Sequence, residues 1–157
     1  MGCVTFKERF FIDGIISARN FECAIKEATS LLKPVINDFI SFDWQQCLGA
    51  SGTPQAITDI LITQGISDSI RIDYLYNLKQ QCIDCESIDF LQIEGLTESR
   101  RAIFPSGLAI LIALFEQLDI QEMQISGGAL REGLIYGMLD NMQQNDRRLQ
   151  TLEQCIK

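Results

Sequence analysis

The spacing of apolar residues predicts a chain made mostly of helices. Between residues 20 and 39, apolar side chains recur every three or four positions, which is the repeat of one helix face. The same periodicity, together with Asn20, Ser87 and Thr97 as helix caps and Gly14 and Gly65 as stops, predicts the other helices. They are expected at residues 6–12, 20–39, 53–64, 72–84, 88–91, 97–104, 107–118 and 129–143.

Three features distinguish individual helices. Residues 107–118 are apolar nearly all round, so this segment is expected to be a buried central helix. Pro34 lies inside the helix expected at residues 20–39 and removes the hydrogen bond to the Ser30 carbonyl, which predicts a kink near Ser30. Pro105 is expected to disrupt the helix that begins after Thr97.

Two short apolar runs lead through glycines into helices. The first, from Gln46, meets Gly49, Ser51, Gly52 and Thr53, with Pro54 expected at the first helical position. The second, residues 122–125, meets a Ser-Gly-Gly turn at 126–128 before a helix that starts near residue 129. Each unit leaves free backbone N–H groups at a helix start, which suits an anion. Together they predict neighbouring parallel strands whose carboxyl ends share one ligand crevice.

The residues at these two turns are the candidate ligand-binding residues. Arg131 lies in the first turn of the last helix, where its charge opposes the helix dipole, so its position indicates a ligand more than helix stability. The candidates are Gly49, Ser51, Gly52, Thr53, Gly127, Gly128 and Arg131.

Simpler roles for these residues stay open. Ser51 and Thr53 are also suited to cap a helix, Gly127 and Gly128 to form a tight turn, and Arg131 to pair with Glu132 or Asp140. Arg100 and Arg101 are interpreted as a solvated face or a salt bridge, which contributes only about 0–1 kcal/mol to stability.

Composition narrows the functional classes. The chain has 157 residues, which favours one domain, and a net charge of −8, which argues against nucleic-acid binding. It has no histidine, which excludes His-based catalysis and His metal ligands within these residues. No apolar run approaches about 18 residues, so we expect no membrane span and a cytoplasmic protein. The six cysteines are expected to be mostly buried free thiols, the Cys82-x-x-Cys85 pair included.

Three motifs, in order along the chain, carry a family resemblance. They are Cys-Leu-Gly-Ala-Ser-Gly-Thr at 47–53, Phe-Pro-Ser-Gly-Leu-Ala-Ile-Leu at 104–111 and Gly-Gly-Ala-Leu-Arg-Glu-Gly at 127–133. Together they resemble the exopolyphosphatase / guanosine pentaphosphate phosphohydrolase (Ppx/GppA) family, and the likeness extends to about Arg148. The sequence is closer to the guanosine pentaphosphate branch, mainly through residues 105–107 and 134–138.

The resemblance implies an α/β fold that is mostly helical. Members belong to the actin-like ATPase superfamily, in which two ribonuclease H-like domains close on a phosphate-bearing ligand. Residues 1–148 would be the C-terminal part of the second domain, with two short parallel strands, and residues 149–157 a polar tail. The first three strands of that domain, its phosphate loop and the catalytic glutamate of the family lie upstream of the matched motifs. The chain is therefore expected to contain no catalytic residue and to be inactive alone.

The resemblance also implies a reaction. The family hydrolyses a terminal phosphoanhydride with water, a carboxylate base and usually Mg²⁺, converting guanosine pentaphosphate to the tetraphosphate or shortening polyphosphate. Carried over to this sequence, residues 49–53 line the cleft, Gly127 and Gly128 lie at the nucleotide side, and Arg131 reaches the guanosine tetra- or pentaphosphate. No Mg²⁺ ligand is assigned in this chain.

Two alternative functions stay open. A stand-alone interaction or dimerisation module would cover open strand edges by forming a homodimer. A kinase of the same superfamily would place Gly127 and Gly128 at an adenosine site, although residues 104–111 and 130–133 favour the phosphohydrolase.

Overall fold

The computed structural model describes residues 1–41 and 44–126, and residues Met1–Ile125 form one compact unit. The elements in chain order are helix α1 (Cys3–Phe10), the 3-10 turn η1 (Ile12–Gly14), α2 (Ala18–Ile40), β1 (Leu48–Gly49), α3 (Gly52–Thr63), α4 (Ile72–Asp84), η2 (Ile88–Phe90), α5 (Glu98–Arg101), α6 (Phe104–Leu118) and β2 (Gln124–Ile125). The helix expected at residues 129–143 lies outside the described residues.

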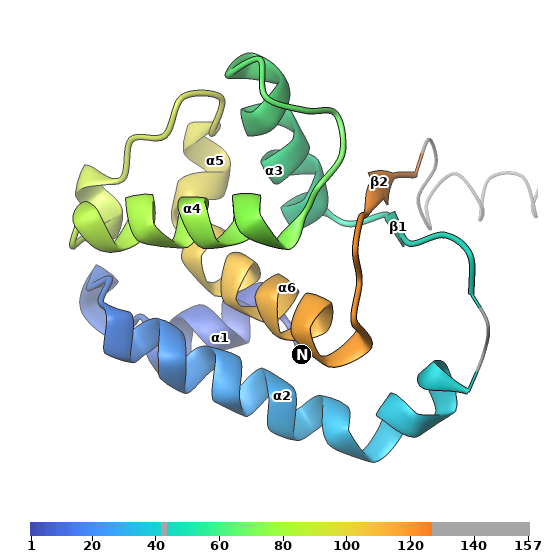
Figure 1. The fold of residues 1–157 in the computed structure, drawn as a ribbon. Coiled ribbons are helices and arrows are strands. Elements are labelled where there is room, and N and C mark those ends of the chain that lie inside the picture. Colours follow the sequence, from blue (N-terminus) through green and yellow to red (C-terminus); the bar gives the residue numbers. More distant parts are fainter. Residues whose placement is uncertain (42–43, 127–157) are drawn as a thin grey trace, which may run out of the picture. The chain divides into compact units, whose positions relative to one another are not determined.

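Helix α6 is the centre of the unit, as its apolar sequence predicts. Helices α1, α2 and α4 all pack against it, and α2 and α4 run along it in Figure 1. Leu108, Ala109 and Ile112 of α6 are completely buried, and so are Phe21 of α2 and Leu75 of α4. Burial of apolar surface, which stabilises the fold by about 25 cal/mol for each Å², is the main contribution that holds these helices together.

Pro105 begins a helix and does not end one, which corrects the expected helix at 97–104. Helix α5 ends at Arg101, the break falls at Ala102 and Ile103, and Pro105 lies in the first turn of α6. The N–H groups of a first helical turn have no partner within the helix, so proline is favoured there at no cost in hydrogen bonds.

The cap of helix α2 lies three residues before the expected one. Ser17 accepts a hydrogen bond from the Asn20 backbone N–H at 3.2 Å, whereas the Asn20 side chain donates to the Ile15 carbonyl at 2.9 Å. Ser17 is therefore the cap and Asn20 secures the turn before it. The helix continues through Pro34 to Ile40, and Figure 1 shows its last turns changing direction, as expected for a proline inside a helix.

The two strands are short and parallel, as expected. Leu48 lies opposite Gln124 and Gly49 opposite Ile125. The connection between α3 and α4 lies beside β2, because Ile70 and Met123 exchange two backbone hydrogen bonds of 2.8 and 2.9 Å. The carboxyl ends of β1 and β2 thus lie side by side, which places Gly49 next to the end of the second strand.

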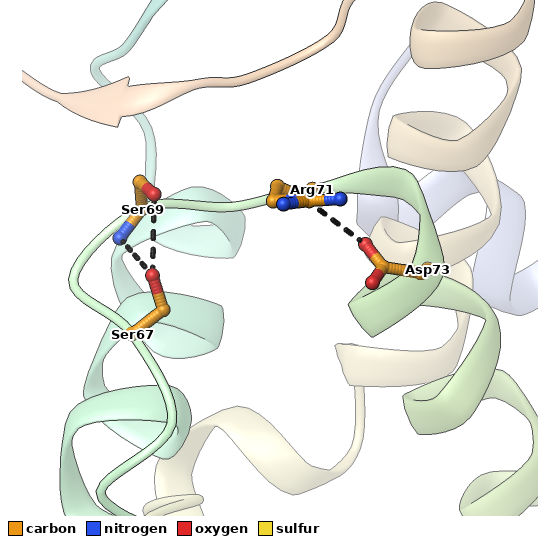
Figure 2. Close-up of polar contacts among 4 residues, drawn as sticks. All are labelled: Ser67, Ser69, Arg71 and Asp73. Atoms are coloured by element: carbon orange, nitrogen blue, oxygen red, sulfur yellow. Dashed lines mark hydrogen bonds and ion pairs between the residues drawn. The ribbon is translucent and has the colours of Figure 1, made fainter.

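Local polar contacts fix the connection between α3 and α4. Figure 2 shows the Ser67 hydroxyl accepting from the Ser69 N–H at 3.1 Å, and Arg71 paired with Asp73 at 3.4 Å where α4 begins. Both residues of the ion pair are exposed, so the pair contributes little to stability. The contacts shape a loop that supports β2.

The cysteines are less buried than expected. The five described cysteines are all free, but only Cys82 is fully buried, while Cys3, Cys47 and Cys85 are partly exposed and Cys23 is exposed. Cys23 lies on the solvent side of α2, because the buried face of that helix contains Phe21, Ala24 and Ala28. Cys155 lies outside the described residues. Within the described part of the chain, no helix has the length and hydropathy needed to cross a bilayer.

Candidate functional site

The turn between β1 and α3, residues 49–53, is called here the glycine corner. Strand β1 ends at Gly49, and Ser51 stands at the N-cap of α3 with extended backbone angles (φ −118°, ψ 171°). The Ser51 side chain makes no capping hydrogen bond, and Thr53 already lies inside the helix. Ser51 thus occupies the cap position without a side-chain capping bond, and Thr53 is not a cap, so the capping interpretation is wrong for Thr53 and stays open for Ser51. The predicted order of strand, glycine turn and helix is confirmed.

Helix α3 begins earlier than expected, at Gly52, so Pro54 is its third residue and not its first. Proline is tolerated throughout the first turn because none of the N–H groups there has an acceptor within the helix. The backbone N–H groups of Gly52 and Thr53 therefore lie in the first turn of α3 and have no acceptor within the helix. Oriented N–H groups of this kind attract anions.

Two glycines allow the glycine corner to pack closely. A Cβ on Gly49 would lie 2.6 Å from Cβ of Pro54 and 2.9 Å from the Met123 sulfur. A Cβ on Gly107 of α6 would lie 2.4 Å from Oγ1 of Thr53. The end of β1 is therefore held against α3 and β2, and the start of α3 is held against α6.

Arg100 lies directly over Gly52, which the sequence analysis missed. A Cβ on Gly52 would lie 2.2 Å from Nη1 of Arg100 and 2.5 Å from its Cζ, so the guanidinium occupies the space that any other residue at position 52 would fill. Arg100 was interpreted as part of a solvated face or a salt bridge. It is exposed, but within residues 1–41 and 44–126 no carboxylate pairs with it. No local sequence pattern links Arg100 to Gly52, since α5 and α3 meet only in the folded chain.

A cavity of about 430 Å³ lies beside the glycine corner. It is lined by Gly49, Ala50, Ser51 and Thr53 of the corner and by residues of α1, α6 and the segment before β2, among them Cys3, Gly107, Leu111 and Met123. A second cavity, of about 510 Å³, is lined by Trp44, Asp119, Glu122 and several glutamines and contains no residue of the glycine corner. Carboxylates there would repel an anion, so the glycine corner is the better candidate for a phosphate ligand.

The groups near the corner do not form a nucleophile or a metal site. Burial raises the pKa of the Cys47 thiol, so at neutral pH this residue is protonated and a poor nucleophile. The described residues also contain no group of three or more Cys, Asp or Glu side chains that would hold a metal ion. What the corner offers is backbone N–H groups and one guanidinium, which bind and orient an anion.

Three of the predicted site residues, Gly127, Gly128 and Arg131, lie outside the described residues. The structure describes the chain up to Ser126, one residue beyond β2. It places the end of β2 beside the glycine corner, as the shared crevice requires.

Comparison with known proteins identifies the family. The model of the Ppx/GppA phosphatase family matches residues 1–142. The chain is 71% identical, over all of its 157 residues, to the guanosine-5'-triphosphate,3'-diphosphate pyrophosphatase of Pseudoalteromonas atlantica. It is 47% identical, over 97% of its length, to the protein of the same name from Vibrio campbellii. The chain spans 31% of the length of each of these two relatives.

A solved structure supports the fold. The crystal structure of the Aquifex aeolicus member of the Ppx/GppA family matches with a TM-score of 0.64 and 16% identity, over 90% of this chain and 47% of that one. At this identity the match establishes the fold, a mostly helical part of an actin-like ATPase fold with two parallel strands. Since the family model covers most of the sequence, the chain belongs to the Ppx/GppA phosphatase family.

Proposed function

We propose that this chain provides one wall of the phosphate-binding cleft of a hydrolase that removes the terminal phosphate from guanosine pentaphosphate, with polyphosphate as the alternative substrate. The observation that carries the proposal is the 71% identity to a guanosine-5'-triphosphate,3'-diphosphate pyrophosphatase along the whole chain. The open start of α3 beside the cavity supports it, since phosphate is the anion that such a turn accommodates.

In this proposal the chain positions the substrate and does not activate water. Phosphoryl transfer depends on alignment of the phosphates and neutralisation of their charge. The N–H groups of Gly52 and Thr53 donate to phosphate oxygens, and Gly49 and Ser51 keep the turn accessible to them. Gly127, Gly128 and Arg131 are assigned to the nucleotide side by resemblance. No catalytic residue is assigned here, so the chain alone is expected to show no turnover.

Mg²⁺ is the cofactor implied by the family. The described residues do not fit a Mg²⁺ site, since no cluster of carboxylates is placed to hold one. The proposal therefore assigns no Mg²⁺ ligand and no step through the metal to this part of the chain.

A chimera tests the proposed function. The matching 31% of the Pseudoalteromonas atlantica enzyme would be replaced by this chain, which the 71% identity makes feasible. The expected result is release of phosphate from guanosine pentaphosphate with kcat/KM within about tenfold of the parent enzyme, and no release by the chain alone. A folded chimera without activity, beside an active parent, would refute the proposal.

The relatives favour the phosphohydrolase among the functions left open by the sequence. Both named relatives are pyrophosphatases, so neither a kinase nor a stand-alone interaction module has support from them. The cytoplasmic location stays part of the proposal. The homodimer stays a prediction, and sedimentation velocity of the chain over a hundredfold range of concentration (about 1–100 μM) would check it.

A further inference from the structure

We propose that Ser106 is a positioning residue for the phosphate site, and that together with Gly107 it sets the spacing of two helix starts, those of α1 and α3, at the cavity. This role rests on the proposed function, because it concerns the same site. Ser106 does not line the cavity itself and acts through the helix that it holds. The ligand class is a chain of phosphates.

Two helix starts line the cavity beside the glycine corner. Gly2 and Cys3 come from the start of α1, and Ser51 and Thr53 come from the start of α3. Neither start has a side-chain capping bond, and neither has an acidic residue in its first turn. Since the first N–H groups of a helix have no partner within it, both starts suit a negatively charged ligand. The distance between them decides whether one phosphate chain contacts both.

Ser106 connects α6 to the start of α1. The residue is only 1% exposed. Its hydroxyl donates to the Cys3 carbonyl at 2.7 Å and to the Ile103 carbonyl at 2.8 Å, so its one hydrogen is shared between two acceptors. The bond to Ile103 is local to the start of α6, whereas the bond to Cys3 joins residues 103 positions apart. This long-range bond fixes where the first turn of α1 lies.

Gly107, the next residue, connects α6 to the start of α3. A Cβ at this position would lie 2.4 Å from Oγ1 of Thr53 and 3.0 Å from its Cγ2, so glycine allows the two helices to approach this closely. Apolar packing is non-directional, whereas a buried hydrogen bond and a contact of this kind each fix a distance. Consecutive residues in the first turn of α6 therefore hold the two helix starts that line the cavity.

A role confined to the stability of α6 accounts for less of this arrangement. Alanine forms helices better than serine and would fill the same buried position without a polar group that needs a partner. A buried serine requires one acceptor, and the Ile103 carbonyl alone supplies it. The additional bond to Cys3 is the contact that a role within α6 leaves unexplained.

The chimera described above, with guanosine pentaphosphate hydrolysis as the readout, tests the role of Ser106. Ser106→Ala is expected to raise KM about three- to tenfold with a smaller change in kcat, because the substrate phosphates lose one fixed wall of their site while the chemical step is unaltered. Ile112→Val changes a completely buried position of α6 that does not line the cavity. This control should lower the urea midpoint but keep KM within about twofold. An equal rise of KM in both variants would overturn the positioning role.

The Cys3 thiol reports on the start of α1 without any turnover. Cys3 lines the cavity and is partly exposed, so its rate of alkylation by iodoacetamide, followed by mass spectrometry, measures the accessibility of this turn. Ser106→Ala in the chimera is expected to raise that rate several-fold, while the exposed Cys23 of α2 reacts at an unchanged rate. Equal alkylation of Cys3 with and without the substitution would also overturn the role of Ser106.

Protection of Cys3 identifies the ligand and needs no substitution. In the unsubstituted chimera, inorganic tripolyphosphate at saturating concentration is expected to slow the alkylation of Cys3 about threefold or more, whereas guanosine leaves it unchanged. Protection by guanosine would mean that the cavity binds the nucleoside, which contradicts a phosphate site between the two helix starts. If tripolyphosphate inhibits hydrolysis without protecting Cys3, its phosphates bind away from the start of α1 and the proposal is refuted.

The two proposals fail in different ways. An inactive chimera refutes the proposed function, and the role of Ser106 with it. An active chimera in which Ser106→Ala has the same KM as the unsubstituted chimera refutes only the role of Ser106.

Discussion

The core around α6 and the glycine corner touch at Gly107 and Thr53, but they use their backbone polar groups in opposite ways. In α6 the backbone groups bond within the helix, and the apolar side chains around it are buried. In the corner the strand is two residues long and the helix start has no side-chain cap. The core around α6 thus contributes most of the stability, whereas the glycine corner contains the backbone groups that are able to bind a ligand.

This difference separates two kinds of substitution. A change in the α6 core alters packing and therefore the free energy of unfolding. A change in the corner alters which donors face the cleft, with a smaller effect on folding wherever the neighbouring atoms are able to move. Two predictions test this division, and a third concerns the exposed surface of α6.

The largest effect is expected in the core. Leu108→Ala removes a completely buried side chain from α6 and should lower the free energy of unfolding by about 2–5 kcal/mol. Leu31→Ala, on the exposed side of α2 where Leu31 is 48% exposed, is the control and should cost less than about 1 kcal/mol. Urea unfolding followed by circular dichroism measures both. Equal losses would show that α6 is not the centre of stability.

An intermediate effect is expected within the corner. Gly49→Ala puts a Cβ 2.6 Å from the rigid ring of Pro54 and should cost about 1–3 kcal/mol through overpacking. Gly52→Ala meets only the flexible end of Arg100, which moves away, so its cost should stay below about 1 kcal/mol. The same urea titration compares the two variants. If Gly52→Ala lowered the free energy of unfolding more than Gly49→Ala does, the contact of Arg100 with Gly52 would contribute to folding. That result would contradict the expectation that Arg100 moves away at little cost.

The smallest effect is expected on the outer surface of α6. The Tyr76 hydroxyl of α4 donates a hydrogen bond to Glu116 of α6, and this bond, with burial and the Glu116 charge, raises the pKa of Tyr76 to about 12. Because the pKa is raised on folding, the contribution of Tyr76 to stability is complete below about pH 10 and is lost as the pH rises from 10 to 12. Tyr76 is largely exposed, so solvent screening keeps this contribution small.

Ultraviolet absorbance detects the ionisation of Tyr76 directly. A tyrosine transition near pH 12 is expected, and Tyr76→Phe should remove it while the control Tyr74→Phe leaves it in place. Glu116→Gln should lower the pKa of Tyr76, since it removes the negative charge that faces the phenol. A transition near pH 12 that persists in Tyr76→Phe would contradict the assignment.

The sequence by itself determined the elements whose cause is local or periodic. The apolar stretch at residues 107–118 identified the central helix, and the apolar periodicity identified the helix expected at residues 53–64, which is α3. The glycines after each apolar run predicted two parallel strands, which the structure confirms. These features depend on neighbours within a few positions, so a single sequence contains the information.

The starts of helices were predicted less well than the helices themselves. Ser17 and Asn20 are both good caps, as are Ser51 and Thr53, and the sequence offers several starts of similar free energy. Packing of the apolar face decides among them, since shifting the start of a helix costs less than exposing Phe21 or Ile57. Pro105 shows the same ambiguity, because the residue that interrupts one helix is well suited to begin the next.

Only the tertiary structure decided which residues share the candidate site. The glycine corner was recognisable from residues 49–53 alone, but the contact between Arg100 and Gly52 was not. That contact depends on the packing of α6 under α3, which brings α5 to the corner, and on the absence of a side chain at position 52. A one-dimensional pattern encodes neighbours along the chain, whereas contacts between distant residues are set by how the buried faces fit together.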